Sequence, residues 1–168
     1  MNQRFAIGFG VGIALLALGV WWGVLDSKGN HLDPTGKIGK VRTLKTDERS
    51  TIVVVDFKIR NDADVAMTIR NIETSMTVPG GGPGDGRLIS APDVEKIFRN
   101  YPELGEQYNP PLKARDQVNG HSVVDRMVAI QFEVPEEMAA ARTDLTLRFE
   151  DISGLMLELH EKPQPKGK

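Results

Sequence analysis

Stretches in which apolar and polar residues alternate recur along this 168-residue chain, and they limit the folds open to it. Successive side chains of a β-strand point to opposite faces of the sheet, so the pattern is typical of strands with one buried face. The alternation and the turns around it predict strands over residues 39–46, 50–61, 65–78, 128–134, 145–149 and 155–159.

These strands predict a mainly β protein. Strands with one apolar and one polar face are typical of antiparallel sheets that pack on another sheet. No stretch alternates a strand with a long helix, which argues against a parallel α/β fold. We therefore expect an immunoglobulin-like or fibronectin-III-like antiparallel β-sandwich over residues 38–161.

Two details of the strand pattern are specific. In residues 65–78 the apolar positions change parity between Ile69 and Met76, which predicts a bulge or break near Asn71. Residues 145–149 and 155–159 flank the turn sequence at 151–154, so we expect them to form a β-hairpin.

The strand signal stops over residues 79–121, which we interpret as a long insertion. The insertion contains one helix pattern from Pro92 to Tyr101, and we expect this short helix to cap an open end of the sandwich. Its glycine-rich start, PGGGPGDG, lacks the Lys-Ser/Thr of a phosphate-binding loop and fits no dinucleotide-binding frame. We interpret this stretch as a flexible loop between a strand and the helix. A further one or two helical turns are expected over 135–141.

The N-terminal region predicts a single membrane span. Residues 5–25 are apolar and uncharged, and as a helix they would cover roughly 30 Å, the thickness of a bilayer core. Arg4 precedes this segment, so the positive-inside tendency leaves residues 1–4 in the cytoplasm and exports the remainder. A signal peptide cleaved near residues 17–19 is the alternative. Residues 26–37 then read as a linker, and 162–168 as a disordered tail.

The apolar segment carries a stripe of glycines at helical spacing. Its members are Gly8, Gly12, Gly19 and Gly23. Such stripes let two membrane helices approach closely, and they also occur because membrane helices tolerate glycine. The stripe therefore makes these residues candidates for packing against a partner helix.

Composition excludes several classes of function. The chain has no cysteine, which removes disulfides, thiolate metal sites and a cysteine nucleophile. Its net charge is −2 with interspersed signs, which gives no electrostatic basis for binding nucleic acid. The three histidines lie in no catalytic or zinc motif. We expect no cofactor and no enzymatic activity. The weak candidates for a calcium site are the loop acids Asp62, Asp64 and Asp151.

Partner binding is expected in the insertion, because exposed loops on rigid sandwiches often carry binding residues. The candidates are Arg87, Phe98, Tyr101 and Tyr108. For Phe98 and Tyr101 the competing interpretation is that they cover the core. Tyr108 stands beside two prolines, and we expect it to be exposed.

The stretches VVVDFKIRNDADVAMTIRNIETSM, VAIQFEVPEE and DLTLRFEDISG carry a resemblance. They resemble small bacterial membrane-anchored β-sandwich proteins and, more distantly, the late-embryogenesis-abundant type domain of water stress and the hypersensitive response. Phe57 and Asn61 match that domain's strand-and-turn pattern, whereas Asp62 stands where the pattern has proline. The resemblance implies a sandwich fold and no known catalysis, and it transfers no functional residue.

Together these observations predict a single-pass protein of the cytoplasmic (inner) membrane with a periplasmic or otherwise extracytoplasmic domain. Its expected role is non-catalytic binding, docking or scaffolding with another protein of the cell envelope; the sequence does not identify a small-molecule ligand. One alternative is a small subunit of a larger membrane complex, held by its glycine-striped helix. Another is a metal-dependent or hydrolytic enzyme.

Overall fold

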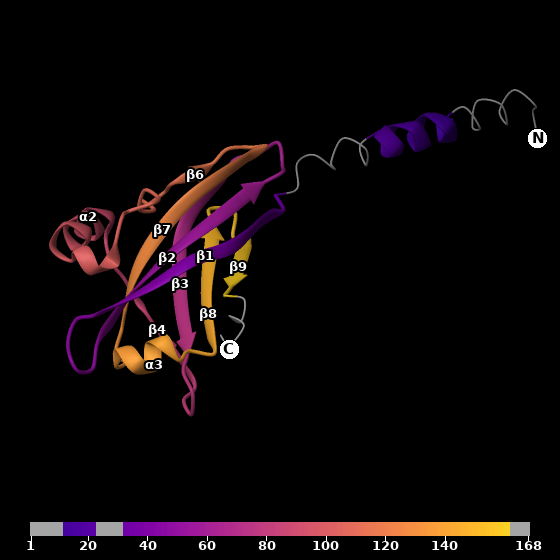
Figure 1. Cartoon of the computed structure of the whole chain (residues 1–168). Helices are drawn as coiled ribbons and strands as arrows, with labels where there is room; N and C mark the ends of the chain where they lie inside the picture. The colour runs from indigo at the N-terminus through magenta and orange to yellow at the C-terminus, as the bar shows by residue number, and fades with distance from the viewer. Residues whose placement is uncertain (1–11, 23–31, 162–168) are drawn as a thin grey trace, which may run out of the picture.

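A computed structural model describes residues 12–22 and 32–161, and its larger part consists of two antiparallel sheets (Figure 1). The strands of the first sheet lie in the order β1 (Pro34–Lys45), β2 (Thr51–Asn61), β7 (Ser122–Phe132) and β5 (Arg87–Leu88). β1 begins at Pro34, inside the range expected for the linker.

In the second sheet the order is β4 (Pro83–Asp85), β3 (Met67–Thr77), β8 (Asp144–Asp151) and β9 (Met156–His160), and the short β6 (Gln117–Val118) also pairs with β3. The expected hairpin between β8 and β9 is confirmed. The register of β3 against β8 shifts between Ile69 and Asn71, which confirms the bulge expected near Asn71. The chain is therefore mainly β, with two antiparallel sheets.

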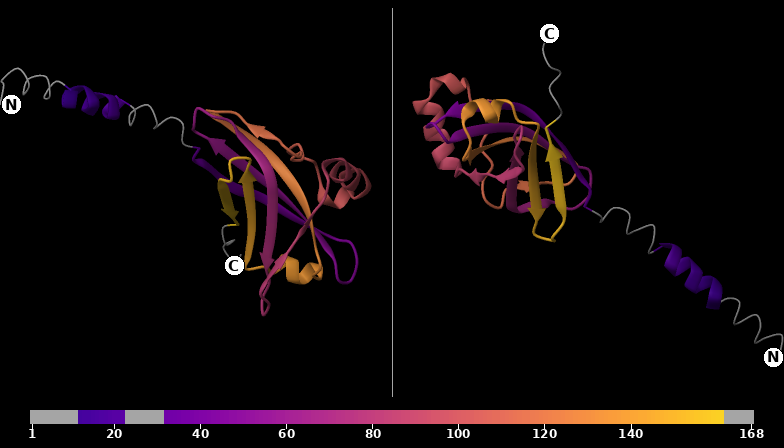
Figure 2. Two further views of the ribbon diagram at one scale, coloured as in Figure 1. Left: turned by 180° about the vertical axis from the view of Figure 1, so that it is seen from behind. Right: turned by 90° about the horizontal axis from the view of Figure 1, so that it is seen from below.

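The two sheets face each other (Figure 2), and residues of both contribute to the main hydrophobic core. The alternating residues Val53, Val55, Phe57 and Ile59 of β2 face it and are almost fully buried. From the opposite sheet Phe149 meets Phe57 with 5.0 Å between ring centroids. This contact is the packing expected when the apolar faces of two sheets meet.

The insertion helix α2 (Ala91–Asn100) forms where proline and acidic residues predicted a helix start. It does not cap an open end of the sandwich, as we expected. It lies on the face of the first sheet that points away from β8 and β9 (Figures 1 and 2). A second apolar cluster forms there, in which Val94 of α2 packs with Val54 and Met127. The outer face of β2 is thus partly buried, although its alternation predicted a polar face.

Two other short helical segments complete the domain. The 3-10 helix η1 (Pro102–Leu104) follows α2, and Leu104 joins the second apolar cluster. The helix α3 (Glu136–Ala140) confirms the helical turns expected after β7.

The glycine-rich stretch contains a short strand that the sequence did not predict. Its residues Pro83–Asp85 form β4 and pair with the end of β3. The chain then passes to the first sheet through Gly86, whose backbone N–H donates to the Thr74 carbonyl at 2.9 Å. A Cβ atom at Gly86 would overlap Ile130 and lie 2.7 Å from the ring of Phe132. The crossing therefore requires glycine at this position.

The predicted membrane span is only partly described. The described part of residues 5–25 is a helix over 12–22. No helix among the described residues is both long and apolar enough to cross a membrane. The disordered tail expected over 162–168 also lies outside the described residues.

We predict that Gly86→Ala destabilises the domain by about 1–3 kcal/mol, because the added methyl group overpacks the core at Ile130 and Phe132. Gly82→Ala is the matched control, since a Cβ there meets nothing within 4 Å. The control should stay within about 0.5 kcal/mol of the natural protein in urea unfolding. Equal effects of the two substitutions would contradict the crossing role of Gly86.

Candidate functional site

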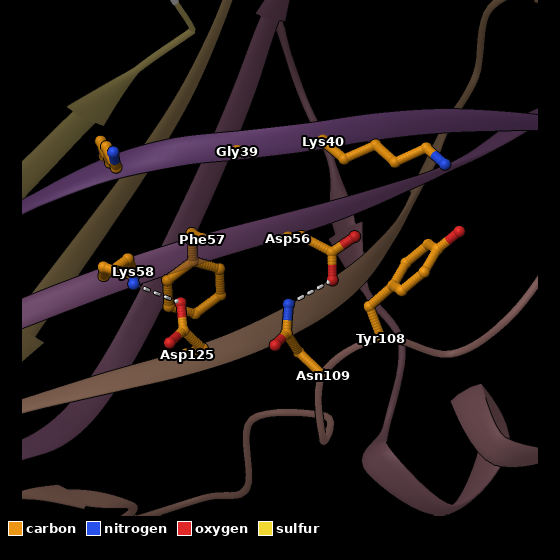
Figure 3. A pocket seen from close by; sticks show the side chains of 9 residues that line it. Gly39, Lys40, Asp56, Phe57, Lys58, Tyr108, Asn109 and Asp125 are labelled. Atoms are coloured by element: carbon orange, nitrogen blue, oxygen red, sulfur yellow. Dashed lines mark hydrogen bonds and ion pairs between the residues drawn. The ribbon is translucent and has the colours of Figure 1, made fainter.

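A groove of about 330 Å³ lies between the bulged edge strand β1 and the loop that follows η1. It is lined by Lys37, Gly39, Lys40, Asp56, Phe57, Lys58, Tyr108, Asn109 and Asp125 (Figure 3). Its residues come from β1, β2, β7 and the insertion, so the groove exists only because the insertion docks on the first sheet.

The β1 side of the groove is shaped by a bulge. The register between β1 and β2 shifts between Ile38 and Val41. A Cβ atom at Gly39 would lie 3.2 Å from the carbonyl oxygen of Asp56, so glycine lets β1 pass close to β2 here. Bulges bend a strand and re-aim its side chains, and this one places Lys40 beside the ring of Tyr108 (Figure 3).

A buried ion pair lies next to the groove. Arg42 Nη2 donates to Asp56 Oδ2 at 2.8 Å, and each side chain is only 8% exposed. The other oxygen of Asp56 accepts a hydrogen bond from Asn109 Nδ2 at 2.8 Å (Figure 3). Both oxygens of this carboxylate are therefore engaged, as a buried charge requires.

The same arginine holds the insertion. Arg42 Nη1 donates to the backbone carbonyls of Leu104 at 3.0 Å and Glu106 at 2.8 Å. Its guanidinium also lies 5.1 Å from the ring centroid of Phe98 and 5.3 Å from that of Tyr108. These contacts join η1, α2 and the Tyr108 loop to the first sheet through one side chain.

The exposed part of the groove has an aromatic wall and basic neighbours. Tyr108 is 57% exposed, and Lys40 Nζ lies 4.9 Å from its ring centroid. Lys58 pairs with Asp125 at 3.2 Å. Lys37 and Lys40 have no ion-pair partner within the described part of the chain. A ligand with an apolar contact surface and a negative charge complements this arrangement.

Removal of Arg42 should be far more damaging than removal of an exposed arginine. We predict that Arg42→Ala destabilises the domain by about 3–5 kcal/mol, because Asp56 remains buried without its cation. Arg60→Ala is the matched control from the neighbouring strand, since Arg60 and Asp62 are 61% and 58% exposed. The control should cost at most about 1 kcal/mol. Denaturant titration of both variants measures the difference, and similar losses would refute the role given to Arg42.

The four predicted partner-binding residues do not form one site. Tyr108 lines the groove, whereas Phe98 of α2 is half-buried against the second apolar cluster. Tyr101 is exposed at the end of α2. Arg87 lies on β5 and lines a different hollow, together with Met76 and Phe132 among others.

Sequence reasoning missed most of the groove. The missed residues include Lys37, Lys40, Asp56, Asn109 and Asp125. One signal was available at Asp56, because an acid that directly follows a continuous apolar run is out of place on a buried strand. Its partner lies on another strand, and no spacing in the sequence identifies it.

The three calcium candidates are separated. Asp62 pairs with Arg60, and Asp64 lies 2.7 Å from His121 Nε2. Asp151 accepts hydrogen bonds from the backbone N–H groups of Thr68 and Ser153 at 2.6 and 2.7 Å. Across residues 12–22 and 32–161 no group of three or more His, Asp or Glu side chains is placed to hold a metal ion. This arrangement gives no support to a calcium site at these three acids, and the interpretation stays a prediction.

Asp151 instead stabilises the turn between β8 and β9. Burial raises the pKa of its carboxyl, but hydrogen bonds from Ser153, Thr68 and Ile152 outweigh burial and hold the pKa below its ordinary value. A carboxyl with a lowered folded-state pKa contributes stability above its unfolded pKa of about 4, and this contribution is lost as the pH falls through the folded value.

We predict that Asp151→Asn costs about 1–3 kcal/mol at pH 7, because a charged acceptor of several hydrogen bonds is replaced by a neutral one. The difference from the natural protein should shrink as the pH falls below about 4. Urea unfolding at pH 7 and pH 3 measures it. A difference that is unchanged between these two pH values would contradict the ionised role of Asp151.

The glycine stripe is only partly described. Gly12 and Gly19 lie on the helix over 12–22, and a Cβ atom at either would meet nothing within 4 Å. Gly8 and Gly23 lie outside the described residues, so the packing role of the stripe stays a prediction.

Comparison with known proteins adds little to this geometry. No protein-family model and no curated protein matches the chain. The archaellum periplasmic stator protein FlaG from Sulfolobus acidocaldarius is 10% identical over 76% of this chain and 99% of that chain, with a TM-score of 0.34. An uncharacterised β-sandwich protein from Clostridium difficile 630 is 11% identical over 79% of this chain and 82% of that chain, with a TM-score of 0.35. Neither likeness assigns a function to this chain.

Proposed function

We propose that this protein is a non-catalytic docking module of the cell envelope, anchored in the cytoplasmic membrane by residues 5–25 and displaying its β-sandwich on the extracytoplasmic side. The apolar segment and the preceding Arg4 support the anchor and its orientation. The partner is another envelope protein that presents an acidic surface to the groove beside Tyr108.

The strand order supports an immunoglobulin-like or fibronectin-III-like assignment. The order β1-β2-β7-β5 corresponds to strands A-B-E-D of that fold, and β4-β3-β8-β9 corresponds to C′-C-F-G. Such sandwiches commonly present binding residues on loops that a rigid framework positions.

The observation that carries the proposal is the way in which Arg42 fixes the insertion. Its three hydrogen bonds hold the loop containing Tyr108 against the first sheet before any partner arrives. A surface that is already ordered loses little conformational entropy on binding, which favours affinity. Tyrosine, such as the exposed Tyr108, is also enriched at interface centres.

The groove's carboxylates favour docking over catalysis. Asp56 is held by Arg42 and Asn109, and Asp125 is paired with Lys58. Both carboxylates thus already have protein partners that position them within the groove wall. This fits a structural role for them and so favours the docking proposal.

Charge reversal in the groove tests the function. We predict that Lys40→Glu abolishes the cross-link to the partner in affinity purification from native membranes, because an acidic partner would face a like charge. Lys45→Glu is the matched control, since Lys45 is exposed at the end of the same strand. The control should keep the partner.

A third sample separates the two membrane hypotheses. In this sample an unrelated membrane anchor replaces residues 1–25. Partner retention places binding on the sandwich, as proposed. The opposite result is loss of the partner in this sample while Lys40→Glu retains it. That result would favour the alternative in which the glycine-striped helix joins a larger membrane complex.

A further inference from the structure

The outer edge of β3 is interrupted. At one end β6 pairs with Met67 and Thr68, and at the other end β4 pairs with residues 75–77. Between them residues 70–73 have β8 on one side and no strand on the other, within the part of the chain that is described. The bulge between Ile69 and Asn71 lies in this interval. We call the open stretch, residues 70–73, the β3 notch.

The backbone at the β3 notch has identifiable free groups. The Thr74 carbonyl accepts from Gly86 N–H on the β4 side. Backbone groups of an antiparallel strand alternate between the two neighbours, so Ile72 points its N–H and C=O to the same side as Thr74. Ile72 pairs with neither β4 nor β6. The notch therefore presents one donor and one acceptor in strand geometry.

An apolar cleft of about 670 Å³ adjoins the notch. Its apolar lining includes Ile69, Ile72, Leu88, Ile89 and Leu112. Leu88 is 40% exposed although it is a large apolar residue on a strand. The cleft has space for a side chain that would enter beside the open backbone edge.

Three charged side chains line the cleft. The charged side chains that line it are Arg70, Lys113 and Glu95. Arg70 also lies 3.4 Å from Glu150, and Lys113 is exposed at the rim. Because Arg70 is already paired with Glu150, Lys113 is the lining cation without an ion-pair partner among the described residues, and it favours an occupant with a carboxylate beside it.

We propose that the β3 notch binds an extended, acidic segment of a partner protein by strand addition. The segment would exchange backbone hydrogen bonds with Ile72, insert an apolar side chain into the cleft and place an acid near Lys113. Four strand residues cover roughly 13 Å, so the notch selects a short segment. The free donor and acceptor distinguish a peptide from a lipid chain, which would leave both unpaired. The notch shares no lining residue with the Tyr108 groove, so this site adds to the proposed function.

Synthetic peptides and the full chain in detergent test the site. The probes are acetylated peptides of pattern Asp-Thr-X-Thr-X-Thr-Asp in which X is Val, Leu or Phe. Each peptide is also made in two N-methylated forms. In one form the backbone nitrogens on one edge of the strand are methylated, and in the other form those on the opposite edge are methylated. Affinity is measured by calorimetry, and hydrogen exchange is followed by mass spectrometry in the segment that contains Ile72.

We predict that at least one peptide slows exchange at Ile72 and that methylation of one edge, but not of the other, abolishes its binding. Leu88→Asp should weaken binding about tenfold or more, because the cleft loses apolar surface. Val123→Asp is the matched control, since Val123 is an exposed strand residue outside the cleft. It should leave affinity unchanged. Unchanged melting temperatures establish that both variants fold.

Lys113→Glu provides a second test that leaves the cleft intact. This substitution should lower the affinity for the acidic peptides and raise the affinity for peptides in which lysine replaces both aspartates. Three results would overturn the proposal: no peptide binds at millimolar concentration, methylation of either edge has no effect, or Leu88→Asp binds as tightly as Val123→Asp. If the fatty acid dodecanoate binds and none of the peptides does, the cleft is a lipid site instead.

Discussion

Arg42 and Asp56 form an ion pair almost fully withdrawn from solvent on the outer face of a sheet, where an ordinary sandwich would face water. Removing two charges from water costs several kcal/mol each, and the attraction between them rarely exceeds that cost. The Arg42 Nε atom is also buried and has no hydrogen-bond partner among the described residues, which adds to the cost. The pair is therefore poorly explained as a source of stability alone. Its geometry is better explained by specificity, because the donors of Arg42 fix where the insertion lies.

The position of the insertion determines the layers of the protein. With α2 and η1 held on the first sheet, β2 is buried on both faces, by the main core on one side and the second apolar cluster on the other. The domain thus has three layers, which are the insertion, the first sheet and the second sheet (Figure 2). The Tyr108 groove and the cleft at the β3 notch both lie where the insertion meets a sheet. Arg42 holds the insertion at the first of these two sites, the Tyr108 groove.

The sequence predicted features that depend on local periodicity. The strand alternation, the β8–β9 hairpin, the bulge near Asn71 and the helices α2 and α3 follow from neighbouring residues and are confirmed. Interactions between distant segments were not predictable in this way. The alternation in β2 suggested a polar outer face, yet the continuous run Ile52–Val55 is the composition of a strand buried on both sides. Recognising this run would have placed the helix on the sheet rather than at its end.

Two glycines of one short stretch illustrate the difference between features set by neighbouring residues and features set by distant segments. Gly80 has a positive φ of 76° beside the turn, which a glycine-rich sequence suggests directly. Gly86 needs glycine for a different reason, since Ile130 and Phe132 of a distant strand occupy the space of a side chain. Without this close crossing, β4 and β5 would not join opposite sheets across a single residue. Because β4 ends where the chain changes sheets, the edge of β3 stays open between β4 and β6. The notch is thus a geometric consequence of that crossing.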